Sequence, residues 1–356
     1  MSRRVGRHVR KAPMSEDPRS IRADAPAPVT LLLMMTGYWI SQAVYTVAKL
    51  NVADALVDGP RTAEELGAVT GAHPPTLHRV MRALASVGVF SQDTPGSFGL
   101  APLGELLRTD RPGSMRPLAV MYCEEQYRAW GDALHSVKTG EPGFSEQFGV
   151  GYFEYLKAHP DADQVFNEAL TGVTVQIVGA VVDSYDFTRF NTIVDVGGSY
   201  GAVLGAVLDA APQARGILFD QPHVIEGARE HLAVAGMAER CTAIGGDFFV
   251  EIPAGGDAYI LAQILHDWDD QRCVDILDHC RRAIRPDGTL LVVEFVLPET
   301  NEPSIGKWLD LHMMVLFGAR ERTAAEFSAL LTAAGFELSR VVPTMAGPSI
   351  IEARPV

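Results

Sequence analysis

The chain has 356 residues, 47% of them hydrophobic, which suits a globular protein with two domains. Its formal net charge is −14, although its first 30 residues carry seven Lys or Arg against three Asp or Glu. A body this acidic argues against nucleic acid as a partner, and the absence of an apolar run near the roughly 20 residues of a span argues against a membrane.

The amino-terminal 28 residues mix Arg, Pro, Ser and Ala without apolar periodicity, and we predict a disordered tail over 1–28. The four cysteines show neither C-x-x-C pairs nor the spacing of a disulfide framework. Reduced thiols in a cytoplasmic protein are therefore expected.

A winged-helix domain is predicted over residues 29–110. The stretch 28–56 is apolar at helical spacing on more than one face, as expected of helices buried against a large partner. Thr62 and Glu65 form a capping box, and two short strands flank a turn at 93–96. The candidate recognition helix offers only Arg79 and Arg82 as full cations, so a DNA-binding regulator stays an alternative rather than the main interpretation.

Residues 111–185 are predicted to be a helical connector rich in aromatic residues. Most of these rings are expected in the core, and some are candidates to line a pocket for a flat substrate. Trp130 and Phe153 are our candidates for the pocket.

From residue 186 to 356, short apolar runs alternate with helical segments at intervals of roughly 25 residues, the signature of a doubly wound α/β sheet. The last two runs, 337–344 and 349–354, resemble a closing hairpin. Ligands of such sheets bind at the carboxyl ends of the strands.

The first strand of this region ends in a glycine turn, "DVGGSYG", at 195–201. The dinucleotide pattern G-x-G-x-x-G does not fit, because Val196 occupies its first glycine position. The turn instead resembles the D/E-x-G-x-G-x-G loop of S-adenosylmethionine enzymes, with Ser199 in place of the middle glycine. We therefore assign Asp195, Gly197 and Gly198 to cofactor binding.

Carboxylates also end the next two strands. Asp220 is placed to accept hydrogen bonds from both ribose hydroxyls, or alternatively caps the following helix. Asp247 and Phe248 offer a carboxylate for an exocyclic amine and a ring to stack on adenine. Gly246 and Gln263 complete the predicted cofactor set.

His266 follows the fourth strand, in "ILHDWDDQRC", on the rim that carries the glycine turn. Glu294 interrupts an otherwise apolar strand and needs a partner, because an unpaired buried carboxylate costs several kcal/mol. His266 is the obvious partner, and Glu321 lies in a comparable position further along the chain. The alternatives are a purely structural histidine and a metal cluster of His266 with the following aspartates; no metal is expected.

Six segments in this order resemble the caffeic acid O-methyltransferase-like family of small-molecule methyltransferases: "VDVGGSYG", "FDQPHVI", "GDFF", "LHDWDDQRC", "VVEFVLPE" and "GARERTAAEF". The resemblance covers roughly residues 30–354. It implies a Rossmann-like sheet of seven strands, S-adenosylmethionine as cofactor, and an intertwined homodimer built by the amino-terminal winged-helix domain. The resemblance also implies that His266 is the base that deprotonates a substrate hydroxyl, with Glu294 and Glu321 bracketing its ring. It adds four residues to the candidates that line the substrate pocket: Asp267, Met313, Met314 and Phe317.

The strength of the base narrows the substrate. Transfer of a proton from a phenol, with a pKa near 10, to an imidazole, with an ordinary pKa near 6.5, costs about 5 kcal/mol. A prearranged site can offset this cost. An aliphatic alcohol would be much harder to deprotonate, so a phenolic or enolic hydroxyl of an aromatic or polyketide-like molecule is expected. N-methylation and a non-methylating decarboxylase or hydroxylase chemistry remain alternatives; neither the substrate nor the methylated position follows from the sequence.

Overall fold

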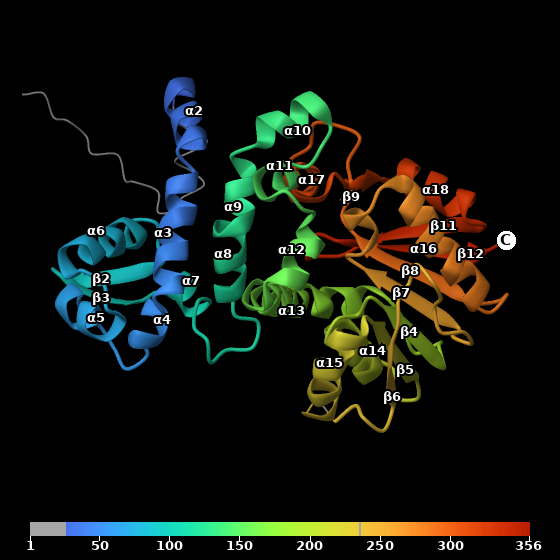
Figure 1. Ribbon diagram of the computed structural model, residues 1–356. Helices are drawn as coiled ribbons and strands as arrows, with labels where there is room; N and C mark the ends of the chain where they lie inside the picture. Colours follow the sequence, from blue (N-terminus) through green and yellow to red (C-terminus); the bar gives the residue numbers. More distant parts are fainter. Residues whose placement is uncertain (1–25, 235) are drawn as a thin grey trace, which may run out of the picture. The chain divides into compact units, whose positions relative to one another are not determined.

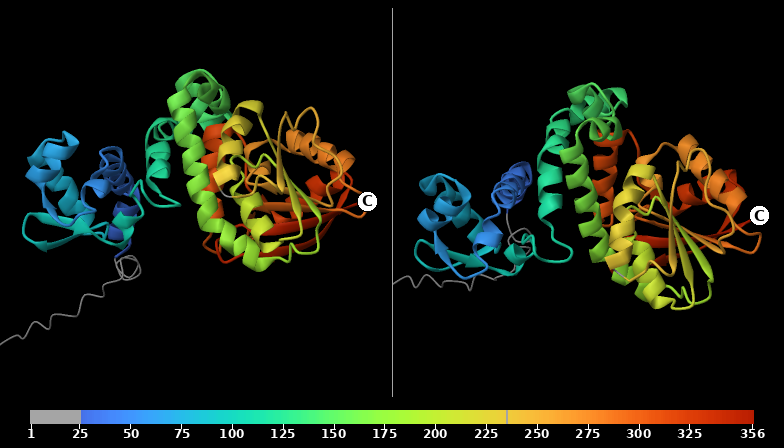
Figure 2. Two further views of the ribbon diagram at one scale, coloured as in Figure 1. Left: turned by 90° about the horizontal axis from the view of Figure 1, so that it is seen from below. Right: turned by 60° about the horizontal axis from the view of Figure 1, so that its bottom comes forward.

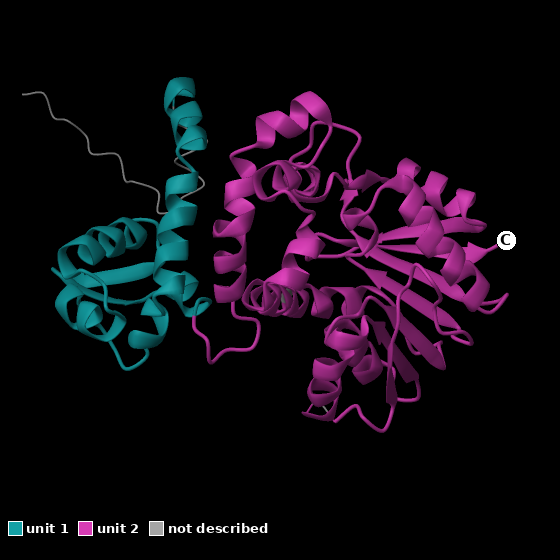
Figure 3. Ribbon diagram, in the orientation of Figure 1, with its two compact units in different colours: residues 1–107 teal, residues 108–356 magenta. Residues whose placement is uncertain are grey.

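The computed structural model describes residues 26–234 and 236–356, which form two compact units that meet in the sequence at Leu107 and Arg108 (Figures 1 and 3). The predicted disordered tail lies outside the described residues as far as position 25, and Ala27 already belongs to the first helix. We keep 29–110, 111–185 and 186–356 as proposed domain limits.

Unit 1 is a small helical domain with a three-stranded antiparallel sheet of order β1-β3-β2. The predicted capping box is present at the start of α5, where the Thr62 side chain accepts from the Glu65 backbone N–H and Glu65 accepts from Thr62. The β2–β3 turn is shorter than expected, since β2 continues to Thr94. The elements are α2 (Ala27–Met35), α3 (Tyr38–Lys49), α4 (Val52–Ala55), β1 (Arg61–Thr62), α5 (Ala63–Thr70), α6 (Pro74–Ala85), β2 (Phe90–Thr94), β3 (Ser97–Leu100) and α7 (Pro102–Glu105).

One helical stretch of the described chain is long and apolar enough to cross a membrane, and a second qualifies only if the two parts of a bent helix are counted as one span. The first is Ala27–Lys49, which is mostly exposed, and the bent one is the helix α13 (Pro160–Ser184), whose parts Pro160–Val175 and Ile177–Ser184 meet at an angle of 42°. Length and composition alone do not distinguish a span from a helix that packs against protein.

Unit 2 opens with the predicted helical segment, whose elements are α8 (Arg116–Cys123), α9 (Glu125–Trp130), α10 (Ala133–Thr139), α11 (Gly143–Phe148), α12 (Tyr152–Ala158) and α13. Aromatic rings of α11 and α12 pack with Val315 and Leu316 of α17 (Ile305–Phe317) in one buried cluster. The segment therefore shares a core with a helix that follows it by more than a hundred residues in the chain.

The rest of unit 2 contains the expected sheet of seven strands, and their order is β11-β12-β8-β7-β4-β5-β6. β4 to β8 are parallel, and the carboxyl-terminal hairpin inserts β12 antiparallel beside β8. The strands are β4 (Thr192–Val196), β5 (Arg215–Asp220), β6 (Cys241–Gly245), β7 (Ala258–Ala262), β8 (Thr289–Glu294), β11 (Phe336–Pro343) and β12 (Ser349–Pro355). A short parallel pair, β9 (Val296–Leu297) with β10 (Arg322–Thr323), lies outside this sheet.

Helices cover both faces of the sheet (Figure 2). Val292 belongs to a core that includes α16 (Asp270–Ala283) and α18 (Ala324–Ala333), while its neighbours Leu291 and Val293 belong to the opposite core with α13, α14 (Ala202–Ala210) and α15 (Pro222–Val234). Because successive strand residues point to opposite faces, both faces of the central strands must be apolar, as their sequences are.

Candidate active site

His266 lies in a single 3₁₀ turn, η1 (Leu265–Asp267), between β7 and α16. Two residues after the turn, Asp269 caps α16 by accepting from the Arg272 backbone N–H at 2.9 Å. Arg322 binds the turn from the other side, donating to the carbonyl oxygens of Leu265 and Trp268 at 2.9 Å each. The histidine is therefore held by a turn fixed at both ends.

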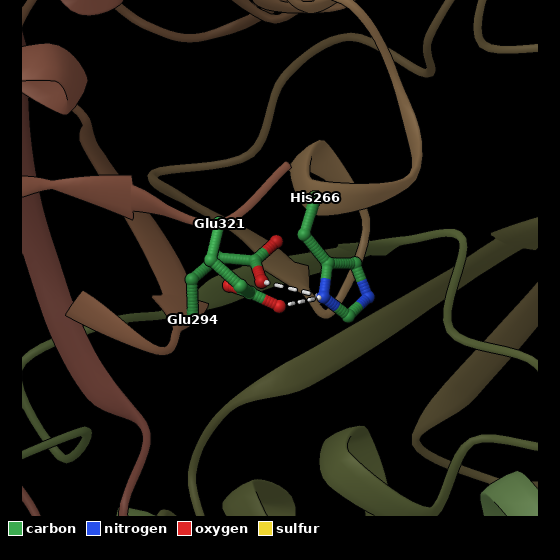
Figure 4. Close-up of side chains that lie close together, drawn as sticks. All are labelled: His266, Glu294 and Glu321. Carbon is green, nitrogen blue, oxygen red and sulfur yellow. Dashed lines mark hydrogen bonds and ion pairs between the residues drawn. The ribbon is translucent and has the colours of Figure 1, made fainter. Parts of the chain in front are cut away.

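Both predicted glutamates meet His266 (Figure 4). Its Nδ1 lies 2.7 Å from Glu321 Oε1 and 3.7 Å from Glu294 Oε2, and all three side chains are buried. Glu294 is the last residue of β8, and Glu321 directly precedes β10.

The two glutamates do not bracket the ring, which corrects the expected arrangement. Both approach the same nitrogen, because Glu294 is fixed at the base of the turn: its Oε1 accepts from the backbone N–H groups of Ile264 and Leu265 at 2.9 Å each. Nδ1–H donates to Glu321, and the opposite nitrogen, Nε2, faces Asp267 Oδ1 at 3.6 Å. This arrangement leaves the Nε2 lone pair as the basic site.

The carboxylates change the acidity of the imidazole. Burial opposes the protonated form, but Glu294, Asp267 and Glu321 outweigh it and raise the pKa of His266 to about 10. Burial raises the pKa of Glu294 to about 7 and that of Asp267 to about 6, and His266 counteracts both shifts. His266 is thus a much stronger base than an ordinary histidine, and the pKa of its protonated ring is close to that of a phenol.

The atoms of His266, Glu294 and Glu321 also lie within 4.8 Å of one another, a spacing that could hold a metal ion. A metal bound at Nδ1 would displace the proton that Glu321 accepts, and Glu294 Oε1 already accepts two backbone N–H groups. The aspartate cluster weighed above does not form, because Asp269 is a helix cap and Asp270 pairs with Arg320 and Arg322.

The glycine turn lies at the carboxyl end of β4, directly over Asp195. A side chain at Gly198 would place its Cβ 2.5 Å from Asp195 Oδ2. At Gly197, where φ is +72°, a Cβ would lie 2.5 Å from Ile264 Cδ1 and would touch the Phe248 ring at 3.7 Å. The turn therefore requires glycine at both positions, and it brings four of the predicted cofactor residues together: Asp195, Gly197, Gly198 and Phe248.

Asp220, at the end of β5, is tied to the same turn. Its Oδ2 accepts from the Ser199 backbone N–H at 2.8 Å and its Oδ1 from that of Gln221 at 2.6 Å. Asp220 is therefore not the cap of α15, and each oxygen keeps a lone pair for a further donor. Asp247 is exposed and accepts from the Phe249 backbone N–H at 2.8 Å.

The other two predicted cofactor residues have evident packing roles. A Cβ at Gly246 would meet the Phe219 ring at 2.5 Å. The Gln263 amide nitrogen donates to Glu294 Oε2 at 3.2 Å, so this side chain supports the His266 cluster.

Buried polar atoms at this edge fit a polar ligand. The Ser199 hydroxyl has no hydrogen-bond partner among the described residues. Neither carboxylate oxygen of Asp195 has a partner there with good hydrogen-bond geometry, although the Leu204 backbone N–H lies near enough to lower the pKa of this carboxyl. Burial, reinforced by Asp220, raises the pKa of Asp195 to about 7. Unsatisfied groups of this kind are rare in native proteins, and a nucleoside carrying hydroxyl and amino groups would satisfy them.

A cavity of about 250 Å³ lies beside the His266 turn. Three of the six predicted substrate-lining residues line it: Phe153, Asp267 and Phe317. Trp130, Met313 and Met314 do not; Met313 is buried, and Met314 packs against the aromatic cluster.

Four residues at this site were not expected from the sequence: Gln126, Trp268, His312 and Arg322. Tyr152 was expected only as one of the aromatic residues of the helical connector, some of which could line a pocket. Tyr152 and Trp268 line the cavity, and the Phe153 and Trp268 rings stack with centroids 5.7 Å apart. His312 could have been noticed as a histidine that interrupts the apolar segment "LDLHMMVLF", and Arg322 as a cation next to a predicted acidic site residue.

Comparisons with known proteins agree with this geometry. The family profile described as an O-methyltransferase domain matches residues 128–337, and the O-methyltransferase dimerisation domain matches residues 32–110. The phenazine O-methyltransferase PhzM of Lysobacter antibioticus is 58% identical over 331 residues, which cover 93% of this chain and 97% of that protein.

Two solved structures extend the likeness. The crystal structure of LaPhzM superposes with a TM-score of 0.91 at 57% identity, covering 93% of this chain and 100% of that one. An O-methyltransferase from neocarzinostatin biosynthesis, solved with S-adenosylmethionine and 2-hydroxy-5-methyl naphthoic acid, has a TM-score of 0.77 at 32% identity, covering 89% and 96% of the two chains.

Proposed function

The chain belongs to the S-adenosylmethionine-dependent O-methyltransferase family, and on that premise we propose that His266 Nε2 takes the proton of a phenolic or enolic hydroxyl on a flat aromatic substrate. The observation that carries the proposal is the 2.7 Å contact between His266 Nδ1 and Glu321. It fixes the proton of the neutral ring on Nδ1 and leaves Nε2 free to act as a base.

The residues at the carboxyl ends of β4 to β6 would hold the cofactor. Asp220 would accept from the ribose hydroxyls, Phe248 would cover the adenine, and Asp195 and Ser199 would gain partners they otherwise lack. When bound, S-adenosylmethionine supplies a methyl group activated by a sulfonium. The chain itself aligns the substrate oxygen, excludes water by burial, and holds the removed proton on His266.

The substrate class is inferred from the cavity and from the relatives. Phe153, Trp268 and Phe317 give the cavity the flat apolar walls that suit an aromatic ring. A relative with 58% identity is named a phenazine O-methyltransferase, so a hydroxyphenazine is the first substrate to test. N-methylation is the second candidate, but a nitrogen lone pair needs no base before it attacks, and this site provides a strong one.

We further propose a cytoplasmic homodimer assembled by unit 1. The dimerisation-domain match covers most of the exposed apolar stretch Ala27–Lys49, which explains that stretch as a protein interface rather than a membrane span.

All four cysteines are free, and burial raises the pKa of Cys273 and of Cys280 to about 12, which keeps both thiols unreactive.

The test is methyl transfer to 1-hydroxyphenazine by the full chain and by His266→Asn. We expect the substitution to lower kcat by at least about a hundredfold while S-adenosylhomocysteine still binds in calorimetry. His279→Asn on α16 is the matched control and should keep full activity. Near-normal turnover by His266→Asn would remove the base assignment, and full activity in EDTA would remove the metal alternative.

A further inference from the structure

Four polar side chains form a chain of hydrogen bonds behind the cavity. Trp130 Nε1 donates to His312 Nδ1 at 2.9 Å, His312 Nε2 lies 3.1 Å from Gln126 Oε1, and Gln126 Nε2 donates to Tyr152 Oη at 2.9 Å. The residues come from α9, α12 and α17, and Gln126 and Tyr152 are both buried.

The direction of this chain is fixed at its first member. The indole N–H can only donate, so His312 Nδ1 must accept and carry no proton. Burial, with a contribution from His266, lowers the pKa of His312 to about 4, so the ring is neutral and its one proton is on Nε2. His312 therefore donates to the Gln126 carbonyl, which turns the Gln126 amide N–H groups towards Tyr152.

Tyr152 is left with a hydrogen to donate. Its oxygen accepts from Gln126, and the structure offers the hydroxyl hydrogen no acceptor among the described residues. Phe144, Phe166 and Phe317 each meet the Tyr152 ring edge to face, at centroid distances of 4.9, 5.6 and 5.5 Å, so the ring has little freedom to turn elsewhere. Burial raises the pKa of Tyr152 further above its ordinary value, and the group stays a neutral donor.

This donor borders the place where the substrate is expected. Tyr152 lines the same 250 Å³ cavity as Asp267, Phe153 and Phe317. The charge of Asp267 acts on Tyr152 and that of His266 acts on His312, so the chain lies within electrostatic reach of the base. A buried hydroxyl that keeps an unused hydrogen beside a binding cavity is an unmet recognition group.

We propose that Tyr152 donates a hydrogen bond to a second polar group of the substrate, and that Trp130, His312 and Gln126 position it to do so. The second group is an acceptor, such as a ring nitrogen, a carbonyl or a carboxylate, on the aromatic molecule whose hydroxyl is methylated. This inference rests on the proposed function and narrows its substrate class to aromatics that carry both a hydroxyl and a separate acceptor.

Matched substrates test the inference. 1-Hydroxyphenazine and 1-hydroxyanthracene differ by ring nitrogens, and 1-hydroxy-2-naphthoate and 1-naphthol differ by a carboxylate. For each pair we take the ratio of kcat/KM for the compound with the acceptor to kcat/KM for the compound without it. We expect this ratio to exceed one in the wild-type enzyme for at least one pair. Tyr152→Phe should lower it about tenfold, while kcat/KM for the compound without the acceptor stays nearly unchanged. Comparing the ratio in the variant with the ratio in the wild-type enzyme cancels the difference in acidity between the two hydroxyls, because that difference is the same in both.

A second variant tests the direction of the chain. Gln126→Glu keeps the side-chain volume, but the ionised carboxylate only accepts, so Tyr152 must donate to it and presents only lone pairs to the cavity. The preference should fall as in Tyr152→Phe, at a pH where the new carboxyl is ionised. Thermal unfolding and S-adenosylhomocysteine binding report whether each variant is folded.

An unchanged ratio in an active, folded Tyr152→Phe enzyme would overturn the inference and leave the proposed function standing. If Tyr152→Phe does not fold, the ratio in Gln126→Glu decides in the same way. Failure of the wild-type enzyme to methylate any of the four compounds would count against both.

Discussion

At the scale of single residues, the activity of His266 depends on how firmly the cluster holds its proton. Below its pKa the imidazole is protonated and cannot accept the substrate proton, and above its pKa it can. Because the pKa of His266 is raised to about 10, the free base is the minor species at neutral pH. Methyl transfer should therefore increase with pH across the neutral and alkaline range.

Glu321→Gln tests this dependence. The substitution removes the carboxylate that accepts from Nδ1 at 2.7 Å, so the pKa of His266 falls. The rising limb of log kcat/KM against pH should move about one to two units to lower pH, and its plateau should drop because the base is weaker. Exposed Glu337→Gln is the charge-matched control, and a limb at the wild-type position would show that Glu321 does not tune the base.

Ser199 is a second residue whose local chemistry can be tested. It replaces a glycine of the cofactor-loop pattern, yet its φ is 51°, a left-handed conformation that side chains disfavour. Its buried hydroxyl also has no partner among the described residues. Ser199→Gly should raise the free energy of unfolding by up to about 1 kcal/mol, the gain being limited by the greater entropy of glycine in the unfolded chain.

Chemical denaturation of the cofactor-free protein would measure this change. Ala202→Gly, at the first position of α14, is the control and should destabilise the protein, because its backbone is helical. A loss of stability in Ser199→Gly would mean that the serine contributes an interaction that outweighs its backbone strain.

At the scale of elements, the His266 turn depends on Arg322 at the start of β10. This guanidinium is completely buried, and besides the two carbonyl groups of the turn it binds Asp270 at 2.8 Å. Arg320 pairs with the same aspartate, but its side chain is 46% exposed. The two arginines thus share a partner and differ in burial.

Arg322→Ala should reduce the free energy of unfolding by about 3 kcal/mol, because buried carbonyl groups lose their donors, whereas Arg320→Ala should cost less than about 1 kcal/mol. Arg322 positions the base without touching it, so kcat should fall and the KM for the phenol should change little. Equal effects of the two substitutions, measured by urea denaturation and steady-state kinetics, would contradict this role.

The sequence predicted the elements of unit 2 well because apolar runs and glycine turns are local signals. The placement of Glu294 near His266 followed from strand ends meeting at one edge of the sheet, whereas Glu321 precedes β10, outside this sheet, and its role was expected from the family resemblance. Their approach to the same imidazole nitrogen could not be predicted, since it depends on two backbone N–H groups that fix Glu294. The Tyr152 chain was missed for a related reason: its hydrogen bonds join residues 26 and 186 positions apart, and each residue alone looks like part of a core.

At the scale of the whole molecule, the free chain carries a concentration of exposed apolar residues in α2 and α3. Met34 is 67% and Trp39 62% exposed, and other large apolar side chains of these helices are also exposed: Leu31, Leu32, Leu33, Met35, Tyr38 and Ile40. Contiguous apolar surface of this kind marks an interface in soluble proteins. The match of this segment to a dimerisation domain favours a second copy of the chain as its partner.

We therefore expect sedimentation equilibrium without detergent to give a particle mass twice that of one chain, which is 38.5 kDa. Trp39→Asp should shift the protein towards the monomer, because a desolvated carboxylate at the interface has no partner and costs several kcal/mol. Met345→Asp adds the same charge at a residue that is 97% exposed in the turn before β12, and it should leave the dimer intact. A wild-type monomer, or a Trp39→Asp protein as dimeric as Met345→Asp, would show that the exposed faces of α2 and α3 serve another partner.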